Sequence, residues 1–142
     1  YGCIRPFHAV EPYRLEMGAK LAVDDARDLY AFWSDKLARA IAPAGSNTTI
    51  VNLASVEYAK AVLPHLAGDA MAVTCLFGEG IRNGKPIQRS TASKKARGSM
   101  VRWMAENKLE DASELTAFNI GYRHIPELSD KNTLVFMNAQ AQ

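Results

Sequence analysis

The chain has 142 residues, of which 48% are hydrophobic and 23% charged, which are ordinary values for one globular domain. It contains no apolar run near the ~20 residues that span a bilayer and no signal-peptide pattern, so we expect a cytoplasmic protein and no membrane partner. The net charge is only +2, and the two cysteines, Cys3 and Cys75, are far apart in sequence, which predicts reduced thiols rather than a disulfide framework.

The first half of the chain predicts one long helix and one strand–helix unit. Residues 1–10 are typical of turns, and residues 12–17 of a strand or extended loop that ends at Gly18. Asp24 and Asp25 can cap a helix that Pro43 and Gly45 end. Its apolar positions recur at helical spacing at Leu29, Phe32, Trp33, Leu37 and Ile41. A buried strand over 48–53 then leads into a helix capped by Ser55 and closed by Pro64.

The second half predicts strands joined by hairpins around one amphipathic helix. Asn83-Gly84 is a strong signal for a type I′ hairpin between a strand at 71–77 and a returning strand at 87–91. The remaining expected elements are a helix over 93–107, a short helix over 112–118 and a hairpin that joins residues 121–122 to residues 134–136. Together these elements predict a mixed α/β fold, with a mixed sheet, β-hairpins and flanking helices, in a single domain over residues 1–142.

Positive charge is concentrated in residues 82–108. This segment holds eight of the seventeen Lys and Arg and one of the fifteen acids, which gives +7, while the nine cations and fourteen acids elsewhere give −5. On a helical wheel Ala96, Met100, Trp103 and Met104 share one face, and the basic residues Lys94, Lys95, Arg97 and Arg102 lie on the remaining arc. Lysines in a first helical turn favour anion binding over helix stability. The segment therefore predicts either a phosphate or nucleic-acid contact or a solvated basic face that binds nothing.

Two further motifs hold polar residues that could form a pocket. Asn52, Ser55, Glu57 and Tyr58 follow the strand over 48–53, and ligands of α/β folds lie at the carboxyl ends of strands. These residues could equally have structural roles only, with Ser55 as a helix cap, Asn52 hydrogen-bonded within a turn and Tyr58 in the core. In residues 12–18, Arg14 and Glu16 share one face of a strand, where they could pair with each other or contact a ligand.

Several chemistries lack a signal in this sequence. The histidines His8, His65 and His124 are isolated, so no metal site is expected, and no P-loop, dinucleotide-binding or nucleophile-elbow motif predicts a cofactor. Cys75 lies in an apolar stretch and is expected in the core.

Seven short motifs follow one another along the whole chain, at residues 1–6, 12–18, 28–33, 52–58, 94–98, 118–122 and 134–136. In this order they resemble the motifs of the YaaA family of bacterial peroxide-stress proteins. Family members begin with a Ser-Pro-Ala-Lys strand and a helical segment that this sequence lacks, so it is expected to be the C-terminal portion of such a protein.

The resemblance implies a cytoplasmic protein that limits damage during peroxide stress, lowers free iron and binds double-stranded or branched DNA through a basic cleft. Carried over by position, Lys94, Lys95 and Arg97 would line that cleft. The neighbouring polar motif residues would be Tyr13, Arg14, Glu16, Asn52, Ser55, Glu57, Tyr58, Asn119 and Tyr122.

Two functions therefore remain open. The first is a protective protein that binds DNA without sequence preference, with Arg14 and the Lys94–Arg102 face on phosphates. The second is an enzyme that acts on a nucleotide or nucleic acid. In this hypothesis Arg14 and Lys94 bind phosphate, and Asn52 and Asn119 contact a base or sugar. Glu16 or Glu57 acts as the general acid or base.

Overall fold

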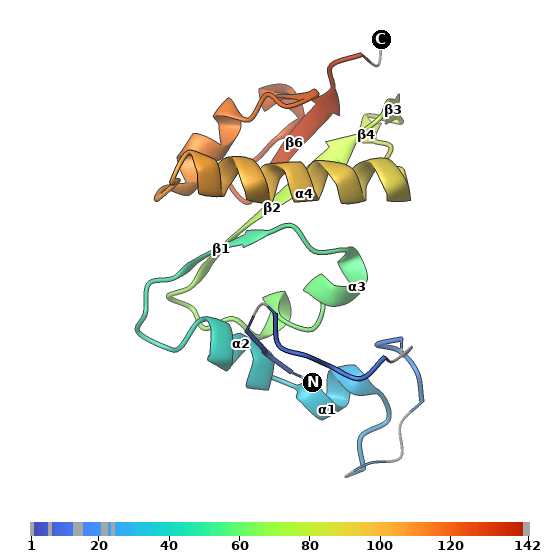
Figure 1. Cartoon of the computed structure of the whole chain (residues 1–142), viewed down its shortest axis with the longest axis vertical. Helices are drawn as coiled ribbons and strands as arrows, with labels where there is room; N and C mark the ends of the chain where they lie inside the picture. Colours follow the sequence, from blue (N-terminus) through green and yellow to red (C-terminus); the bar gives the residue numbers. More distant parts are fainter. Residues whose placement is uncertain (1, 6, 13–15, 21–22, 24, 141–142) are drawn as a thin grey trace. The chain divides into compact units, whose positions relative to one another are not determined.

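The computed structural model describes residues 2–5, 7–12, 16–20, 23 and 25–140, and these form two compact units. The first unit contains residues 1–50 and 54–71, and the second contains residues 51–53 and 72–142. Figure 1 shows their elements in sequence colours, from blue in the first unit to red at the end of the second.

The helix expected to continue through Ile41 is two short helices in the first unit. Helix α1 covers Leu29–Trp33 and α2 covers Lys36–Ile41. Ser34 separates them, because it takes a left-handed φ of 46° while its amide donates to the Tyr30 carbonyl at 2.8 Å. No Gly or Pro marks this break, so the apolar spacing alone predicts one helix. The predicted end before Pro43 is confirmed.

The N-cap of α1 is Asp28 rather than the Asp25 expected from the sequence, and Asp24 lies outside the described residues. The Asp28 carboxylate accepts a hydrogen bond from the Ala31 amide at 2.8 Å. This bond satisfies one of the amides that have no partner within the helix.

Strand β1 covers Thr49–Asn52 and crosses from the first unit into the second at residue 51. Helix α3 follows over Val56–Ala59, and a 3₁₀ turn, η1, covers Leu63–His65. Ser55 is the N-cap of α3 as expected, but its hydroxyl makes no capping hydrogen bond. The predicted helix is thus shorter than expected, and Pro64 lies inside the 3₁₀ turn.

The second unit is built on a mixed sheet, in which the strands follow the order β1-β2-β6-β5. Its other three strands are β2 (Met71–Gly78), β5 (Tyr122–His124) and β6 (Thr133–Asn138). Strands β2 and β6 are parallel, with Thr74 opposite Thr133 and Gly78 opposite Met137, and β5 is antiparallel to β6. This β5–β6 pair confirms the predicted last hairpin.

The Asn83-Gly84 turn is confirmed, but the strand after it is shorter than predicted. Strands β3 (Ile81–Arg82) and β4 (Lys85–Pro86) form a small antiparallel hairpin, and both turn residues have positive φ, of 51° and 71°. No strand forms over 87–91, because helix α4 covers Ser90–Glu106 and starts three residues earlier than expected. Two 3₁₀ turns follow, η2 over Ala112–Ala117 and η3 over Pro126–Leu128.

The core of the second unit lies between α4 and the sheet, and Figure 1 shows α4 crossing in front of strands β2 and β6. Alternate residues of β2 point into this core and reach Ala96 and Met100 on α4, as the helical wheel predicts. Phe77, Phe118 and Phe136 are fully buried, and their ring centroids are 5.5 to 6.1 Å apart. These rings fix α4 and the strand ends that hold the candidate site.

The expected fold class is confirmed. The chain is mixed α/β, with a mixed four-stranded sheet, a β-hairpin and flanking helices. The prediction of one domain over the whole chain stays a prediction.

Candidate functional site

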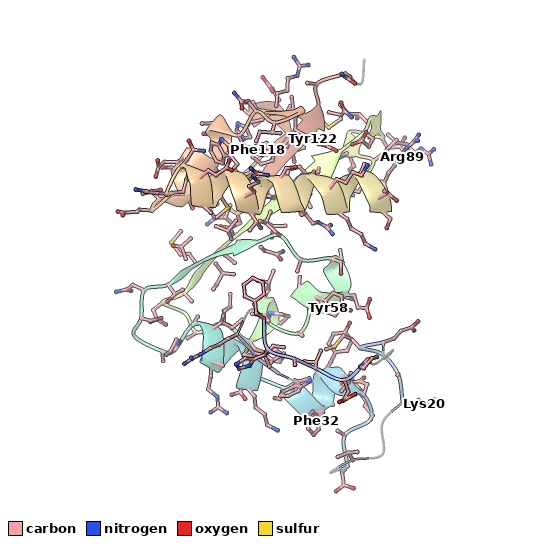
Figure 2. All side chains as sticks on the ribbon, in the orientation of Figure 1. Lys20, Phe32, Tyr58, Arg89, Phe118 and Tyr122 are labelled. Carbon is pink, nitrogen blue, oxygen red and sulfur yellow. The ribbon has the colours of Figure 1, made fainter. Side chains whose placement is uncertain are left out.

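Five basic residues of the second unit are exposed on the β3–β4 hairpin, at the N-cap of α4 and in the first half of α4. We define the basic surface as Arg82, Lys85, Arg89, Lys94 and Lys95, which are all exposed. Figure 2 shows Arg89 at the N-terminal end of α4. The ion pairs found among the described residues involve none of these five side chains. None of these five charges is therefore neutralised by an ion pair found among the described residues.

The structure distinguishes Arg102 and Arg97 from these exposed, unpaired cations. Arg102 is exposed, but its Nε donates to Glu106 at 2.7 Å, so its charge is balanced within its own helix. The carboxylate of Glu106 also raises the pKa of Arg102. Arg97 is half-buried rather than outward-facing, and its Nε and the Ser93 hydroxyl are buried without a hydrogen-bond partner among the described atoms.

The lysines also occupy a different turn of the helix from the one predicted. Because α4 starts at Ser90, its first turn contains Ser90 to Ser93, and Lys94 and Lys95 belong to the second turn. The expected conflict between lysines and the helix dipole is thus weaker than the sequence indicates, since the dipole acts mainly on the first turn. The lysines are explained better by their exposure than by an anion site at the helix end.

A polar cluster lies at the carboxyl ends of the parallel strands β2 and β6. Glu79 directly follows β2, Asn138 ends β6, and Tyr122 pairs with Asn138 across β5–β6. The Tyr122 hydroxyl donates to Glu79 Oε1 at 2.5 Å, and Asn138 Nδ2 donates to Glu79 Oε2 at 2.8 Å. One carboxylate thus joins segments that are 43 and 59 residues apart.

This cluster keeps Glu79 ionised and Tyr122 protonated. The hydrogen bonds from Tyr122 and then from Asn138 hold the pKa of the Glu79 carboxyl below its ordinary value, and the charge of Arg89 acts in the same direction. Burial and the hydrogen bond to Glu79 raise the pKa of Tyr122 to about 12. At neutral pH the cluster therefore presents a carboxylate acceptor held by two donors.

The cluster forms one wall of a pocket of about 290 Å³. The opposite wall is the face of α4 that carries Lys95 and Ser99. The complete lining is Glu79, Ala92, Lys95, Ala96, Ser99, Gly121, Tyr122, Asn138 and Gln140. The sequence had indicated Lys95 and Tyr122, but not Glu79 or Asn138.

The two predicted asparagines of the second unit do not line this pocket. Asn52 is buried at the end of β1, and its Nδ2 donates to the Thr74 hydroxyl of β2 at 3.1 Å. Asn119 is exposed between η2 and β5. A ligand role for either residue stays a prediction.

The first unit contains the remaining predicted residues. Glu57 is exposed in α3, where its Oε1 accepts from the Met17 amide at 3.1 Å and its carbonyl accepts from the Tyr30 hydroxyl at 3.0 Å. Glu16 is exposed beside Met17, so the two candidate acids, Glu16 and Glu57, lie on neighbouring segments. Tyr58 is 57% exposed, which excludes the core position considered for it. Figure 2 labels it on α3.

Tyr13 and Arg14 lie outside the described residues, so the structure does not describe the proposed Arg14 contact with phosphate or with Glu16. The contacts of Glu57 to residues 17 and 30 are those of a side chain that holds local structure together. They give no geometric support to an acid–base role, which stays a prediction.

Comparison with known proteins identifies the family. The family described as Peroxide stress protein YaaA matches residues 1–128 of the chain. The chain belongs to the YaaA family. The matched residues include parts of both units, with residues 28–33 and most of 52–58 in the first and residues 94–98 in the second.

The YaaA-family chain is similar to bacterial proteins named UPF0246. It is 45% identical to one from Desulfitobacterium hafniense over 143 aligned residues, which cover 100% of the chain and 56% of the relative. It is 44% identical to one from Pediococcus pentosaceus, with 96% of the chain and 54% of the relative covered, and 40% identical to one from Lachnoclostridium phytofermentans, with 99% and 54% covered. The chain thus spans about half the length of these relatives.

The described residues of this YaaA-family chain contain no group of three or more His, Cys, Asp and Glu side chains that could hold a metal ion. None of their helices is long and apolar enough to cross a membrane. Cys75 is buried in β2 as predicted, and burial raises the pKa of its thiol to about 12, so it is an unreactive core residue.

Proposed function

We propose that this chain is a cytoplasmic peroxide-stress protein that binds DNA without sequence preference through its basic surface, and that this contact limits iron-dependent damage to the DNA. The observation that carries the proposal is the exposure of five cations on the β3–β4 hairpin and α4, none of which joins an ion pair found among the described residues. Such charges bind phosphates by releasing condensed counterions.

The arrangement of the cations supports backbone contact rather than base reading. Arg82 and Lys85 are opposite each other on the hairpin, and Lys94 and Lys95 are adjacent on α4. A helix that reads bases in the major groove pairs Arg or Lys with guanine and Asn or Gln with adenine. The exposed first half of α4 presents two lysines and small residues but no Asn or Gln, and lysines also suit phosphate contacts.

Membership of the YaaA family supports the protective part of the proposal, since the family description refers to peroxide stress. Iron-driven oxidation damages DNA at the backbone and bases, so a protein that covers phosphates also competes for the sites where iron cations collect. In this proposal the chain needs no metal site of its own.

The test is fluorescence anisotropy of a labelled duplex and a labelled four-way junction, titrated with the chain at several salt concentrations. We expect affinity to fall log-linearly with salt for both DNAs, because phosphate neutralisation dominates. Binding that does not depend on salt, or no binding by a folded sample at low salt, contradicts the proposal.

A further inference from the structure

The pocket beside the basic surface has a mixed character that phosphate binding alone does not require. It lies at the carboxyl ends of two parallel strands, which is where α/β proteins bind ligands. Its volume of about 290 Å³ is near the lower limit of small-molecule sites. It can therefore hold one planar ring system, whereas a double helix is too large to enter.

The acceptor in this pocket is the Glu79 carboxylate. Each of its oxygens already accepts one hydrogen bond, from Tyr122 or Asn138. A carboxylate oxygen has two lone pairs, so each oxygen can accept one further bond. A ligand that meets Glu79 must therefore donate an N–H or an O–H group.

Cations lie close to the same carboxylate. Lys95 lines the pocket, and the charge of Arg89 acts on Glu79. A simple anion would be attracted by these cations but repelled by Glu79. A simple cation would be attracted by Glu79 but repelled by Lys95 and Arg89. The ligand that suits both has uncharged N–H or O–H donors on one part and a negative charge on another. A nucleotide has this arrangement, because its base and sugar donate hydrogen bonds and its phosphate is anionic.

We propose that this pocket binds one unpaired nucleotide, with a base or sugar donor on Glu79 and the phosphate on Lys95. The nucleotide must be unpaired because a base stacked inside a duplex cannot reach a pocket of this kind. It comes either from a DNA strand held on the basic surface, in which case the inference rests on the proposed function, or from a free mononucleotide.

The experiment measures the affinities for two labelled duplexes that differ only by a one-nucleotide bulge. We expect the chain to bind the bulged duplex about tenfold more tightly, the size expected for a hydrogen bond to a charged group. Glu79→Gln should bring the ratio of the two affinities down toward one, because the amide keeps only one of the two acceptor oxygens and lacks the negative charge that strengthens the hydrogen bond. The ratio cancels any general effect of the lost negative charge on DNA binding.

Two further variants control the experiment. Glu127→Gln removes the same charge from an exposed carboxylate in η3, which precedes the start of β6 and so lies at the opposite edge of the parallel pair, and it should keep the tenfold ratio. Ser99→Trp fills the pocket from α4 and leaves the Glu79 hydrogen bonds in place, so it should abolish the ratio even if Glu79→Gln does not fold.

Isothermal titration calorimetry with deoxyadenosine monophosphate distinguishes the two sources of the nucleotide, a DNA strand and a free mononucleotide. Binding of the free nucleotide that is lost in Glu79→Gln, without a preference for the bulge, supports the pocket and assigns it to free nucleotides. A preference for the bulge that depends on Glu79 assigns it to DNA. If both duplexes bind with equal affinity and the free nucleotide does not bind, the inference is overturned. If neither duplex binds at low salt but the free nucleotide does bind, only the proposed function is overturned.

Discussion

Replacing Lys94 and Lys95 together by Ala tests the basic surface quantitatively. If all five exposed cations of that surface contact phosphates, the slope of log affinity against log salt is about −4.5, since each phosphate contact contributes about −0.9. Between 50 and 200 mM salt this slope corresponds to a loss of about 500-fold in affinity. The double variant keeps three cations, so its slope should be about −2.7 and its loss about 40-fold. Anisotropy of one labelled duplex at four or more salt concentrations measures both slopes.

The controls for this prediction separate local contact from overall charge. Lys60→Ala with Lys131→Ala removes the same net charge from two exposed lysines outside the basic surface, and it should leave the slope unchanged. Arg102→Ala should change the slope little, because Glu106 already balances that charge. Equal slopes for the wild type and the Lys94/Lys95 variant would refute the reasoning, and so would an equal drop in the Lys60/Lys131 control.

Three further predictions concern the structure around the site. Phe136→Ala should lower the free energy of unfolding by about 3–5 kcal/mol in a denaturant titration, because Phe136 is fully buried among other rings. Gly78→Ala should cost about 1–3 kcal/mol in the same assay, because a Cβ there would lie 2.5 Å from Met137 Sδ; an unchanged midpoint in either variant would contradict the packing. Tyr122 has a pKa above its ordinary value of 10.0, so its stabilising effect is complete below that pH and is lost as the pH rises through about 12. Tyr122→Phe should therefore be less sensitive than the wild type to pH between 10 and 12 in thermal unfolding, and equal sensitivity would count against the Glu79–Tyr122 bond.

Local signals in the sequence predicted most elements of the second unit. The apolar stretch at 71–77, the Asn83-Gly84 turn and the apolar face of α4 each have a short-range physical cause, and each is present in the structure. The prediction failed where the deciding factor was not local. Ser34 ends α1 with a left-handed φ that no Gly or Pro announces, and α4 extends back to Ser90 through residues expected in a strand.

The candidate site was predicted only in part, because it depends on strand order. The sequence indicated Lys95 and Tyr122 as site residues, but it gave no reason to select Glu79 among fifteen acids. Glu79 becomes distinctive when β2 lies parallel to β6, since this arrangement brings its carboxylate beside Asn138 and Tyr122. Parallel pairing joins segments that are distant in the chain, and no short motif encodes it. The remaining signal is that Glu79 directly follows a buried apolar strand.

The position of Gly78 links the packing of the core to the chemistry of the pocket. This residue is buried at the end of β2, where Met137 and Pro86 leave no room for a side chain. The next residue is Glu79, whose amide donates to the Ile87 carbonyl at 2.8 Å and so fixes the chain as it enters the hairpin. The close approach of β6 and the hairpin at Gly78 therefore sets where the Glu79 carboxylate lies relative to Lys95. A displaced strand end should weaken binding in the pocket while the exposed lysines of α4 still contact phosphate, so the two activities should be separable by mutation.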